Sequence, residues 1–393
     1  MKLVFVHDGP LFYDENGNYY EFAYHELLQR YSYLADEISF LMRIKPITKK
    51  RKFTLVPKDI KVVSVPDFKS IKNIRKRKDA SEIIEATIKE NDYVVFRLQS
   101  SIAQIGIKYA KKHKKPYIIE SVGCPWDSYW NHSLLGKFVA PFSYLETKKA
   151  IYEAEYVYYV TKEFLQRRYP TQGYSVSCSN VVLEKLDDNI LENRFKKIDK
   201  MRKGRPVTIG TAAALDVRYK GQEYVIRAIA RLNKEGYNFV YKLAGGFTGQ
   251  KENNYLSYIA KQCDVEKNVI FEGSLPASKM NDYYDSLDLY VQPSKQEGLP
   301  RAVIEAMSRG CPCIGTNIAG IPELIRGDLM FKKGNVKAVE QALMHICKSD
   351  LKNIAQQNFE KAREYEKEKL EKKRASFYND FLERYKIYRG GSL

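Results

Sequence analysis

The chain has 393 residues, a formal net charge of +18 and 44% hydrophobic residues. This length predicts two domains, because single hydrophobic cores stop growing at about 250–300 residues. No uncharged apolar run approaches the roughly 20 residues that a membrane-spanning helix needs. The first residues are typical of a β-strand and not of a signal peptide, because charge follows a short apolar stretch. We therefore expect a cytoplasmic protein with an anionic partner: nucleic acid, a lipid surface or a phosphorylated substrate.

The N-terminal half alternates short apolar runs with helical patterns. A loop rich in turn-forming residues follows the first strand. Strands are predicted at residues 3–6, 61–65, 93–98, 117–120 and 157–160, and helices at about 21–35, 80–90 and 102–112. The strands are continuously apolar, which is typical of a parallel sheet covered by helices on both faces.

The C-terminal half repeats this alternation. Strands are predicted at residues 207–211, 239–244, 269–272, 289–292 and 313–316, and helices at 222–235, 280–287 and 301–309. Two such series in tandem predict an α/β chain of two Rossmann-like, doubly wound domains.

The predicted boundary lies in the charged, weakly apolar stretch 183–206, which we interpret as a hinge. The domains are then 1–190 and 205–370. Residues 350–389 form one long, charged helical pattern. Its end, 371–393, is expected to be a helix that packs back on the N-terminal domain.

The sequence shows no motif for a metal site or a reactive thiol pair. The six cysteines form no CxxC pair and no histidine has zinc-finger spacing, so we interpret them as small buried residues in a reducing compartment. No Asp-x-Asp motif follows a strand. We therefore expect neither an essential metal nor a cofactor.

The segment 291–307 carries the strongest chemical signal. A buried strand ends, and a helix begins near Pro300, a residue that suits the first helical turn. The N–H groups and the positive dipole end at such a helix start favour phosphate. Glu297 precedes the helix and Glu305 lies about two turns further on, roughly 8–12 Å away. Two carboxylates at this separation can hold the ribose and the hexose of a nucleotide-sugar with its phosphates between them.

The alternative for this segment is a capped amphipathic helix with a solvated Glu305. Its position argues against that alternative, because open α/β sheets bind ligands at the carboxyl edge of their strands. Glu305 is also followed by Ala306 and Met307, an unusual setting for a solvated carboxylate.

A family resemblance follows from five motifs: Pro293-Ser294, Glu297-Gly298-Leu299-Pro300, Val303-Ile304-Glu305-Ala306-Met307, Gly310-Cys311-Pro312 and Gly320-Ile321-Pro322-Glu323. Together they resemble the signature of GT4 glycosyltransferases, which are of the group 1 type. The resemblance is strong over residues 207–326 and weak elsewhere. It implies the GT-B architecture, with two Rossmann-like domains facing across a cleft, a retaining mechanism and a nucleotide-diphosphate sugar as donor.

The resemblance also implies roles for individual residues. Glu297 takes the place of the glutamate that contacts the donor sugar, and Glu305 that of the glutamate that holds the ribose. Lys220 corresponds to the diphosphate lysine, and a fixed ammonium there would stabilise the leaving group. Ala214 stands where the family usually has an arginine, so that Arg218 or Arg301 would have to supply the missing cation.

Further donor contacts are expected from the resemblance. Asn180 resembles the hinge asparagine of the family. A plain turn is the alternative for the two adjacent glycines that end a predicted strand. The remaining donor-binding candidates are Gly9, Arg218, Gly245, Gly246, Glu272, Gly298, Leu299 and Arg301.

The acceptor half departs from the family pattern. Many relatives have a histidine after the strand at 117–120, whereas this chain has Glu120 and then Asp127. We predict both as catalytic residues that orient the acceptor; a capped loop is the alternative. His132, nearby, is interpreted as an ordinary polar contact. The basic runs 43–52, 69–78 and 111–115 are candidates for binding an anionic membrane surface, with a solvated surface as the alternative.

The sequence thus predicts a retaining, metal-independent hexosyltransferase of polysaccharide biosynthesis, peripheral on the inner face of the membrane. Its catalytic residues would be Glu297, Lys220, Asp127 and Glu120. It would move a sugar from a nucleotide-diphosphate sugar to a hydroxyl of a surface glycan or lipid-linked saccharide. One alternative is a non-catalytic GT-B-fold protein that binds nucleotide-sugars, which Ala214 favours. Specific nucleic-acid binding is not expected, because only the charge supports it.

Overall fold

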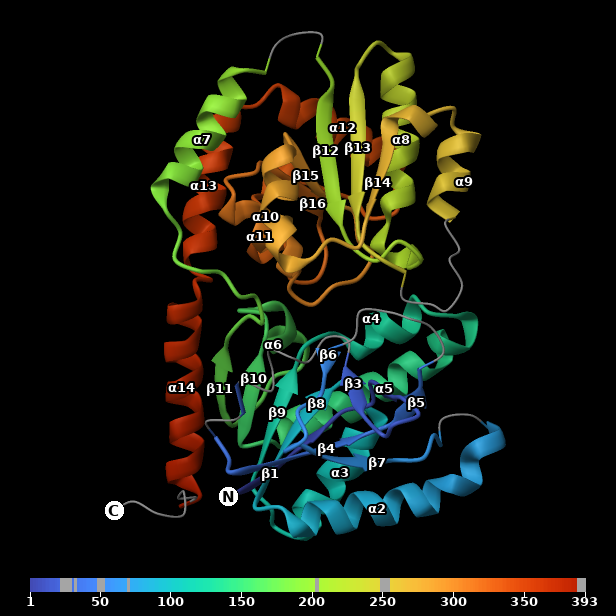
Figure 1. Ribbon diagram of the computed structural model, residues 1–393, viewed down its shortest axis with the longest axis vertical. Helices are drawn as coiled ribbons and strands as arrows, with labels where there is room; N and C mark the ends of the chain where they lie inside the picture. Colours follow the sequence, from blue (N-terminus) through green and yellow to red (C-terminus); the bar gives the residue numbers. More distant parts are fainter. Residues whose placement is uncertain are drawn as a thin grey trace. The chain divides into compact units, whose positions relative to one another are not determined.

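The chain divides into two compact α/β units in the computed structural model, which describes residues 1–21, 30–31, 34–47, 54–68, 71–201, 205–247 and 255–386. Unit 1 comprises Met1–Cys178 and the C-terminal segment from Lys373, and unit 2 comprises Ser179–Lys372. Each unit has its own parallel sheet with helices beside it (Figure 1). The predicted pair of Rossmann-like domains is therefore confirmed.

Unit 1 contains, within the described residues, a seven-stranded parallel sheet in the order β11-β10-β9-β8-β1-β4-β7. Its strands are β1 (Lys2–Val6), β4 (Glu37–Met42), β7 (Lys61–Ser64), β8 (Tyr93–Leu98), β9 (Tyr117–Ser121), β10 (Tyr156–Tyr159) and β11 (Tyr174–Ser177). Its first helices are η1 (Ile71–Lys76), α2 (Arg77–Glu90), α3 (Ser101–Lys112), α4 (Pro125–Trp130), α5 (Leu134–Tyr152) and α6 (Phe164–Arg168). The strand order reverses between β1 and β8, as in a doubly wound sheet.

A small second sheet stands where the sequence predicted only a loop. It has the order β5-β2-β3-β6 and is formed by β2 (Leu11–Tyr13), β3 (Tyr19–Glu21), β5 (Ile44–Pro46) and β6 (Thr54–Leu55). Asp14 accepts hydrogen bonds from the N–H groups of Asn16 and Asn18, and Gly17 has φ +77°, so the turn-forming residues join two short strands. The helix predicted at 21–35 lies largely outside the described residues.

Unit 2 has six parallel strands among its described residues, in the order β14-β13-β12-β15-β16-β17. They are β12 (Val207–Ala212), β13 (Phe239–Ala244), β14 (Val269–Gly273), β15 (Leu289–Gln292), β16 (Cys313–Thr316) and β17 (Met330–Phe331). Its longer helices are α7 (Asp188–Asp199), α8 (Gln222–Lys234), α9 (Tyr255–Gln262), α10 (Ala277–Ser286), α11 (Arg301–Ser308), α12 (Val336–Cys347) and α13 (Leu351–Arg363). Contacts join α8 to α9 and α12, and α11 to α10 and α13, which gives two helical layers (Figure 1). The strand order reverses between β12 and β15.

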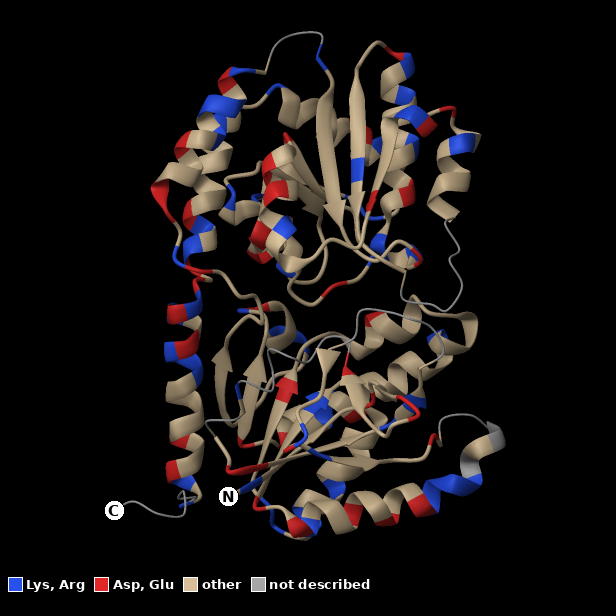
Figure 2. Ribbon diagram, viewed as in Figure 1, with Lys and Arg blue, Asp and Glu red and all other residues tan. Residues whose placement is uncertain are grey.

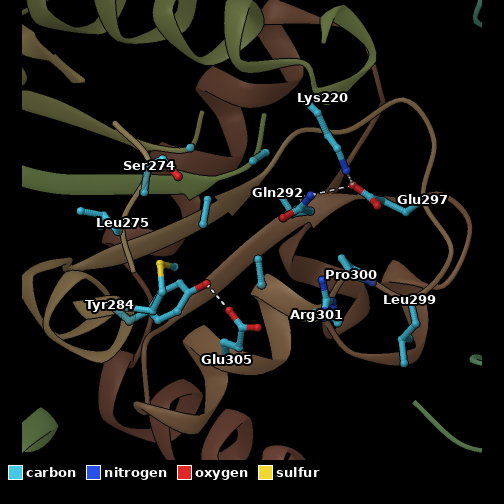
Figure 3. Close-up of a pocket in the computed structure, with 16 residues that line it drawn as sticks. Lys220, Ser274, Leu275, Tyr284, Gln292, Glu297, Leu299, Pro300, Arg301 and Glu305 are labelled. Carbon is cyan, nitrogen blue, oxygen red and sulfur yellow. Dashed lines mark hydrogen bonds and ion pairs between the residues drawn. The ribbon is translucent and has the colours of Figure 1, made fainter. Parts of the chain in front are cut away.

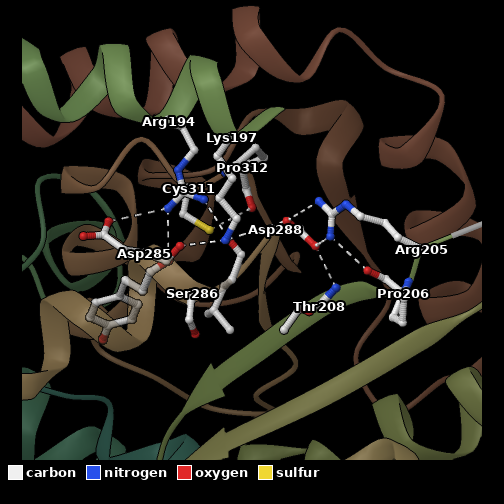
Figure 4. A network of polar contacts seen from close by, with 12 residues as sticks. Arg194, Lys197, Arg205, Pro206, Thr208, Asp285, Ser286, Asp288, Cys311 and Pro312 are labelled. Carbon is white, nitrogen blue, oxygen red and sulfur yellow. Dashed lines mark hydrogen bonds and ion pairs between the residues drawn. The ribbon is translucent and has the colours of Figure 1, made fainter. Parts of the chain in front are cut away.

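The boundary between the units corrects the predicted hinge. Residues 183–206 include α7, and α7 belongs to unit 2. Its Arg194 is 3% exposed and donates to the backbone carbonyls of Tyr284, Leu287 and Arg309 at 3.0, 2.6 and 3.0 Å (Figure 4). One of the charges in the stretch 183–206 is therefore the buried guanidinium of Arg194. The boundary between the units lies at 178/179, beside Asn180, and not at 190.

The long helical pattern predicted at 350–389 is two helices, α13 and α14 (Lys367–Arg384). The break occurs where the chain pairs with an earlier segment: Lys367 donates its N–H to the carbonyl of Leu183 at 2.7 Å. From Lys373 onward α14 belongs to unit 1. Its Phe377 and Phe381 pack edge-on against Tyr156 of β10, with ring centroids 5.7 and 5.1 Å away.

Candidate active site

A pocket opens in unit 2 at the carboxyl ends of β12, β13 and β15, next to the point where the strand order reverses. Open α/β sheets bind ligands at this place. Its volume is about 430 Å³, within the range of small-molecule sites. The lining residues are Ala212, Ala213, Lys220, Ala244, Gly245, Ser274, Leu275, Met280, Tyr284, Gln292, Glu297, Leu299, Pro300, Arg301, Ala302 and Glu305 (Figure 3).

Two glycines allow the loops around this pocket to approach closely. Gly245 has φ +154°, and a Cβ on it would lie 2.0 Å from the carbonyl oxygen of Ala213. Gly221 follows Lys220 with φ +76°, and its Cβ would lie 2.1 Å from the carbonyl oxygen of Pro293. Only glycine fits either position without moving the backbone.

Lys220 and Glu297 form one end of the pocket. Lys220 ends the short helix η2 (Arg218–Lys220), and its Nζ lies 2.7 Å from Oε1 of Glu297. The same oxygen accepts from Gln292 Nε2 at 2.9 Å (Figure 3). It also accepts from Ser294 Oγ at 2.7 Å. Its other oxygen, Oε2, makes no hydrogen bond or ion pair with any described residue. Glu297 is thus fixed through one oxygen, and the other can accept from a ligand.

The ion pair with Glu297 keeps the Lys220 ammonium protonated. Burial lowers the pKa of Lys220, but the neighbouring Glu297 carboxylate more than offsets this effect, so the pKa lies above that of an ordinary lysine. Arg301, in the first turn of α11, lines the same pocket. α11 has no side-chain cap at Pro300 and no acidic residue in its first turn. This corner therefore presents two cations and a helix start, which suits a diphosphate.

Glu305 forms the other end of the pocket (Figure 3). Its Oε2 accepts from the Tyr284 hydroxyl at 2.7 Å. Burial, and then the charge of Glu305, raise the pKa of Tyr284 well above its ordinary value, so the phenol remains a donor. No described residue occupies Oε1 of Glu305, which leaves an acceptor for a ligand hydroxyl.

Other predicted donor residues are placed differently. The Arg218 guanidinium lies over the Tyr255 ring, 5.0 Å from its centroid, and does not line the pocket. Glu272 pairs with Lys242 at 3.2 Å and also lies outside the lining, where the adjacent Ser274 contributes instead. Gly246 and Gly298 flank lining residues without belonging to them. Of the predicted catalytic and donor-binding residues, six line this pocket: Lys220, Gly245, Glu297, Leu299, Arg301 and Glu305.

Comparison with known proteins identifies the family. The model of the family "Glycosyl transferases group 1" matches residues 193–367. Protein CapJ from Staphylococcus aureus is 32% identical over 348 residues, which cover 86% of this chain and 84% of CapJ. The chain belongs to the group 1 glycosyltransferases.

Two more distant likenesses add to this. The amylovoran biosynthesis glycosyltransferase AmsK from Erwinia amylovora is 29% identical over 155 residues, 37% of each chain. The structure of HepE from Anabaena in complex with UDP-glucose superposes with a TM-score of 0.64 at 15% identity, covering 99% of this chain and 100% of HepE. Together with the two parallel sheets, such neighbours confirm the GT-B fold class of this glycosyltransferase.

The acceptor residues predicted for this glycosyltransferase lie in unit 1. Glu120 is 2% exposed, accepts from Arg97 Nε at 3.0 Å and is hydrogen-bonded to the Tyr31 hydroxyl. It is a buried structural ion pair, which corrects its prediction as an accessible catalytic group. Asp127 is partly exposed in the first turn of α4 and lies 3.7 Å from Arg168, so it stays a candidate. Gly9 donates its N–H to His7 Nδ1 at 2.9 Å in the turn after β1.

Three functional contacts of the glycosyltransferase escaped sequence reasoning. Gln292 ends β15, and Ser294 stands in the Pro293-Ser294 motif. Their hydrogen bonds to Glu297 depend on how the loop between them and Glu297 folds. Tyr284 lies on α10, 21 residues before Glu305, and nothing in its local pattern marks it. Spacing finds residues of one helix, whereas these contacts join different elements.

The part of the chain that the structure describes shows no metal-binding cluster, no disulfide and no membrane-spanning helix. No group of three or more His, Cys, Asp or Glu residues there could hold a metal ion. Its cysteines are all free, and four of them are buried: Cys124, Cys178, Cys311 and Cys313. Over the same residues, no helix combines the length and apolar character needed to cross a bilayer.

Proposed function

We propose that this glycosyltransferase transfers a hexose, with retention of the anomeric configuration, from a nucleotide-diphosphate sugar to a hydroxyl of a surface glycan or lipid-linked saccharide. The pocket of unit 2 carries the proposal. One corner of this pocket is cationic and is formed by Lys220, Arg301 and a helix start. A carboxylate that can accept a hydrogen bond from the ligand stands at each end, Glu297 at one and Glu305 at the other. A ribose, a diphosphate and a hexose in a row need this order of groups.

The comparisons support the two substrates at different levels. HepE, which shares the fold, was solved with UDP-glucose, so a uridine-diphosphate sugar is the first donor to test. AmsK is named for amylovoran biosynthesis, which favours a saccharide acceptor in polysaccharide biosynthesis. The acceptor site is proposed to lie in unit 1, with Asp127 as the group that orients the hydroxyl.

The chemistry follows from where charge develops. The bond from the anomeric carbon to the diphosphate oxygen breaks, and a bond from the same carbon to the acceptor oxygen forms on the same face of the sugar. The proton of the acceptor hydroxyl passes to the departing diphosphate. Lys220 and the helix start at Arg301 stabilise the negative charge that grows on the leaving diphosphate. Glu297 orients the hexose through its unoccupied oxygen, and Glu305 holds the ribose. Cations of the chain fill the place at the diphosphate, so we propose that transfer requires no metal.

A thermal-shift screen with nucleotide-diphosphate sugars tests this function, because a ligand that binds only the folded state raises its melting temperature. UDP and UDP-glucose are expected to stabilise the chain, and transfer to a saccharide acceptor should release UDP. If no nucleotide-sugar stabilises the protein, the donor assignment is wrong.

Glu305→Ala is expected to weaken donor binding by roughly 10- to 100-fold. A hydrogen bond to a charged group contributes about 1.5–3 kcal/mol, and the buried Tyr284 hydroxyl also loses its partner. Isothermal calorimetry with UDP measures the change. Tyr284→Phe is the matched control: it leaves the carboxylate in place and should cost much less. Unchanged UDP affinity in Glu305→Ala would remove Glu305 from the donor site.

Arg301→Gln is expected to reduce UDP affinity about tenfold, since it removes a cation from the diphosphate corner. Arg218→Gln should change UDP affinity little, because Arg218 stacks on Tyr255 outside the pocket lining. The same calorimetric titration compares the two variants. A larger loss in Arg218→Gln would show that Arg218, and not Arg301, compensates for Ala214.

The second candidate, a non-catalytic nucleotide-sugar-binding protein, has one observation in its favour: Ala214 replaces a family arginine. In the structure the carbonyl of Ala214 accepts from Gln222 Nε2 at 3.0 Å, so this position serves the backbone packing. Steady release of UDP from UDP-sugar in the presence of acceptor would exclude this candidate. Donor-dependent stabilisation without any release would favour it.

A further inference from the structure

The helix α5 of unit 1 presents large apolar side chains to solvent. Leu134, Leu135, Phe138 and Phe142 are 76%, 78%, 75% and 76% exposed, and Leu145 is 61% exposed. The first four alone expose on the order of 500 Å² of apolar surface, if a large side chain has roughly 150–250 Å². The largest apolar patch on a typical monomer is about 300–600 Å² and is often functional, so a patch of this size is a candidate interaction site.

The buried side of α5 is made of smaller residues. Gly136 and Ala140 are buried there, as are Thr147 and Ala150 further along. At Gly136 a Cβ would lie 2.1 Å from the carbonyl oxygen of Tyr129, so the start of α5 sits directly on α4. Over residues 134–145 the helix thus packs closely through small residues and turns its large ones outward, whereas Ile151 near its end is large and buried. The folding of unit 1 does not explain why those outer residues are apolar.

Most charges around this patch are positive; the exception on α5 itself, Glu146, pairs with Lys108 at 3.4 Å. Between Asp127 and Glu146 the sequence contains no acidic residue. Lys137 and Lys148 are exposed on α5 and lie over the rings of Trp130 and Tyr144, with Nζ 5.6 and 5.8 Å from the centroids. Neither forms an ion pair with any residue that the structure describes. In Figure 2, α5 is drawn tan over most of its length.

Amphipathic aromatic residues stand at both ends of the patch. Trp130 is 43% exposed just before α5, and Tyr152, the last residue of α5, is 44% exposed. Such side chains favour the boundary between lipid and water. The exposed apolar residues from 134 to 145 extend over about 17 Å of helix, which suits a helix lying in the plane of a bilayer surface.

We propose that the outer face of α5 binds an anionic lipid bilayer: Leu134, Leu135, Phe138, Phe142 and Leu145 enter the apolar boundary, and Lys137 and Lys148 contact acidic headgroups. Membrane binding would bring the enzyme to a lipid-linked or surface-bound acceptor, and only this purpose rests on the proposed function. A bilayer fits better than a protein partner, because the patch combines insertable apolar residues, unpaired cations and terminal aromatic residues.

The basic runs singled out in the sequence are less suited to this role. Lys111 pairs with Glu153 and Lys112 with Glu85, and Lys115 donates to the carbonyl of Asn91. Arg43 pairs with Asp67 and Asp8. Parts of the other two runs lie outside the described residues. Arg75, Lys76, Arg77 and Lys78 are exposed and form no ion pair with a described residue, but no described large apolar side chain is exposed beside them in the sequence. Lys137 and Lys148, in contrast, stand next to the exposed apolar residues of α5.

Vesicle binding of the full chain tests the proposal. Both tryptophans of the chain, Trp126 and Trp130, lie in α4 beside the patch, so their emission reports on its environment. With phosphatidylcholine vesicles containing phosphatidylglycerol at low ionic strength, the protein should co-sediment and its emission should shift to shorter wavelength. The triple variant Leu135→Gln/Phe138→Gln/Phe142→Gln should lose about tenfold or more in partitioning. It should fold normally, because all three residues are exposed.

Two further variants make the test specific. Tyr258→Gln removes an aromatic ring that is 63% exposed on α9 of unit 2, and this variant should bind vesicles like the wild type. Lys137→Glu/Lys148→Glu should lose about tenfold of the affinity for anionic vesicles and most of the preference over neutral ones. A wild-type protein that binds no anionic vesicles, or a triple variant that binds them unchanged, would overturn the proposal.

Two other measurements separate this inference from its alternatives. Sedimentation of the free protein shows whether the patch joins two copies; a dimer that the triple variant abolishes, with no vesicle binding, would also overturn it. Stabilisation by UDP is measured on the same variants. A triple variant whose melting temperature still rises with UDP, but which no longer binds vesicles, supports the α5 surface as the membrane-binding site. A wild-type protein whose melting temperature does not rise with UDP would contradict the donor site and not the α5 surface.

Discussion

Replacing Lys220 with Met is expected to lower kcat about 10²- to 10³-fold, the usual effect of removing one preorganised group that stabilises developing charge. The Lys220 ammonium lies in the pocket 2.7 Å from Glu297, with its pKa raised by that pairing, so it is charged whenever the enzyme works. The leaving diphosphate carries more charge in the transition state than in the bound donor. KM for the donor should therefore change less than kcat.

Initial rates of UDP release give both constants. Lys295→Met is the matched control: it removes a lysine 3.9 Å from Glu223 that does not line the pocket, and it should retain nearly full activity. Gln292 and Ser294 still hold Glu297 in the Lys220→Met variant, so the site should keep its shape. Equal losses in the two variants, or a loss confined to KM, would show that Lys220 does not act on the leaving group.

Arg194→Met should destabilise unit 2 by about 3–5 kcal/mol, because it removes three buried hydrogen bonds from a charged group to backbone carbonyls. The carbonyls of Tyr284 and Leu287 keep a second donor each, the Leu287 N–H and Lys197 Nζ. For a unit of this size, the destabilisation corresponds to a fall in melting temperature of roughly 10 °C. The effect should be confined to stability, since Arg194 lies on α7 and does not line the pocket. Differential scanning calorimetry of the full chain measures it.

Lys352→Met provides the comparison for Arg194. Lys352 forms an ion pair with Asp199 at the end of the same helix, at 2.7 Å, but both side chains are exposed. Exposed pairs contribute little to stability, so the melting temperature should barely change. If the two variants melt alike, the buried guanidinium is not what fixes α7 to unit 2, and the boundary at 178/179 needs another explanation.

The sequence predicted the fold best where one physical signal was strong. The strands 239–244, 289–292 and 313–316 coincide with β13, β15 and β16, because buried parallel strands are continuous apolar runs. It failed where short elements depend on partners far away in the chain. The small sheet pairs β3 with β6 across more than 30 residues, and α7 is held by the buried Arg194. Local composition indicated a loop in one case and a hinge in the other.

The candidate site shows the same division. Glu297, Glu305 and Lys220 stand in recognisable motifs, and all three line one pocket. Local pattern could not decide which charged residues face that pocket. Arg218 precedes Lys220 by two residues, yet it turns to the Tyr255 ring. Glu120 ends a predicted strand, where a ligand-facing side chain is expected, but it is a buried partner of Arg97. Such choices are made by tertiary packing, which residue spacing does not encode.

The division of the chain into units has a consequence for biosynthesis. Unit 2 is a continuous stretch, Ser179–Lys372, whereas unit 1 is interrupted by it and resumes only at Lys373. Phe377 and Phe381, which pack against Tyr156 in unit 1, are synthesised only after all of unit 2. Because domains of a growing chain fold as their residues emerge, unit 2 can fold before unit 1 is complete. The core of unit 1 around Tyr156 can therefore close only after unit 2 has been made.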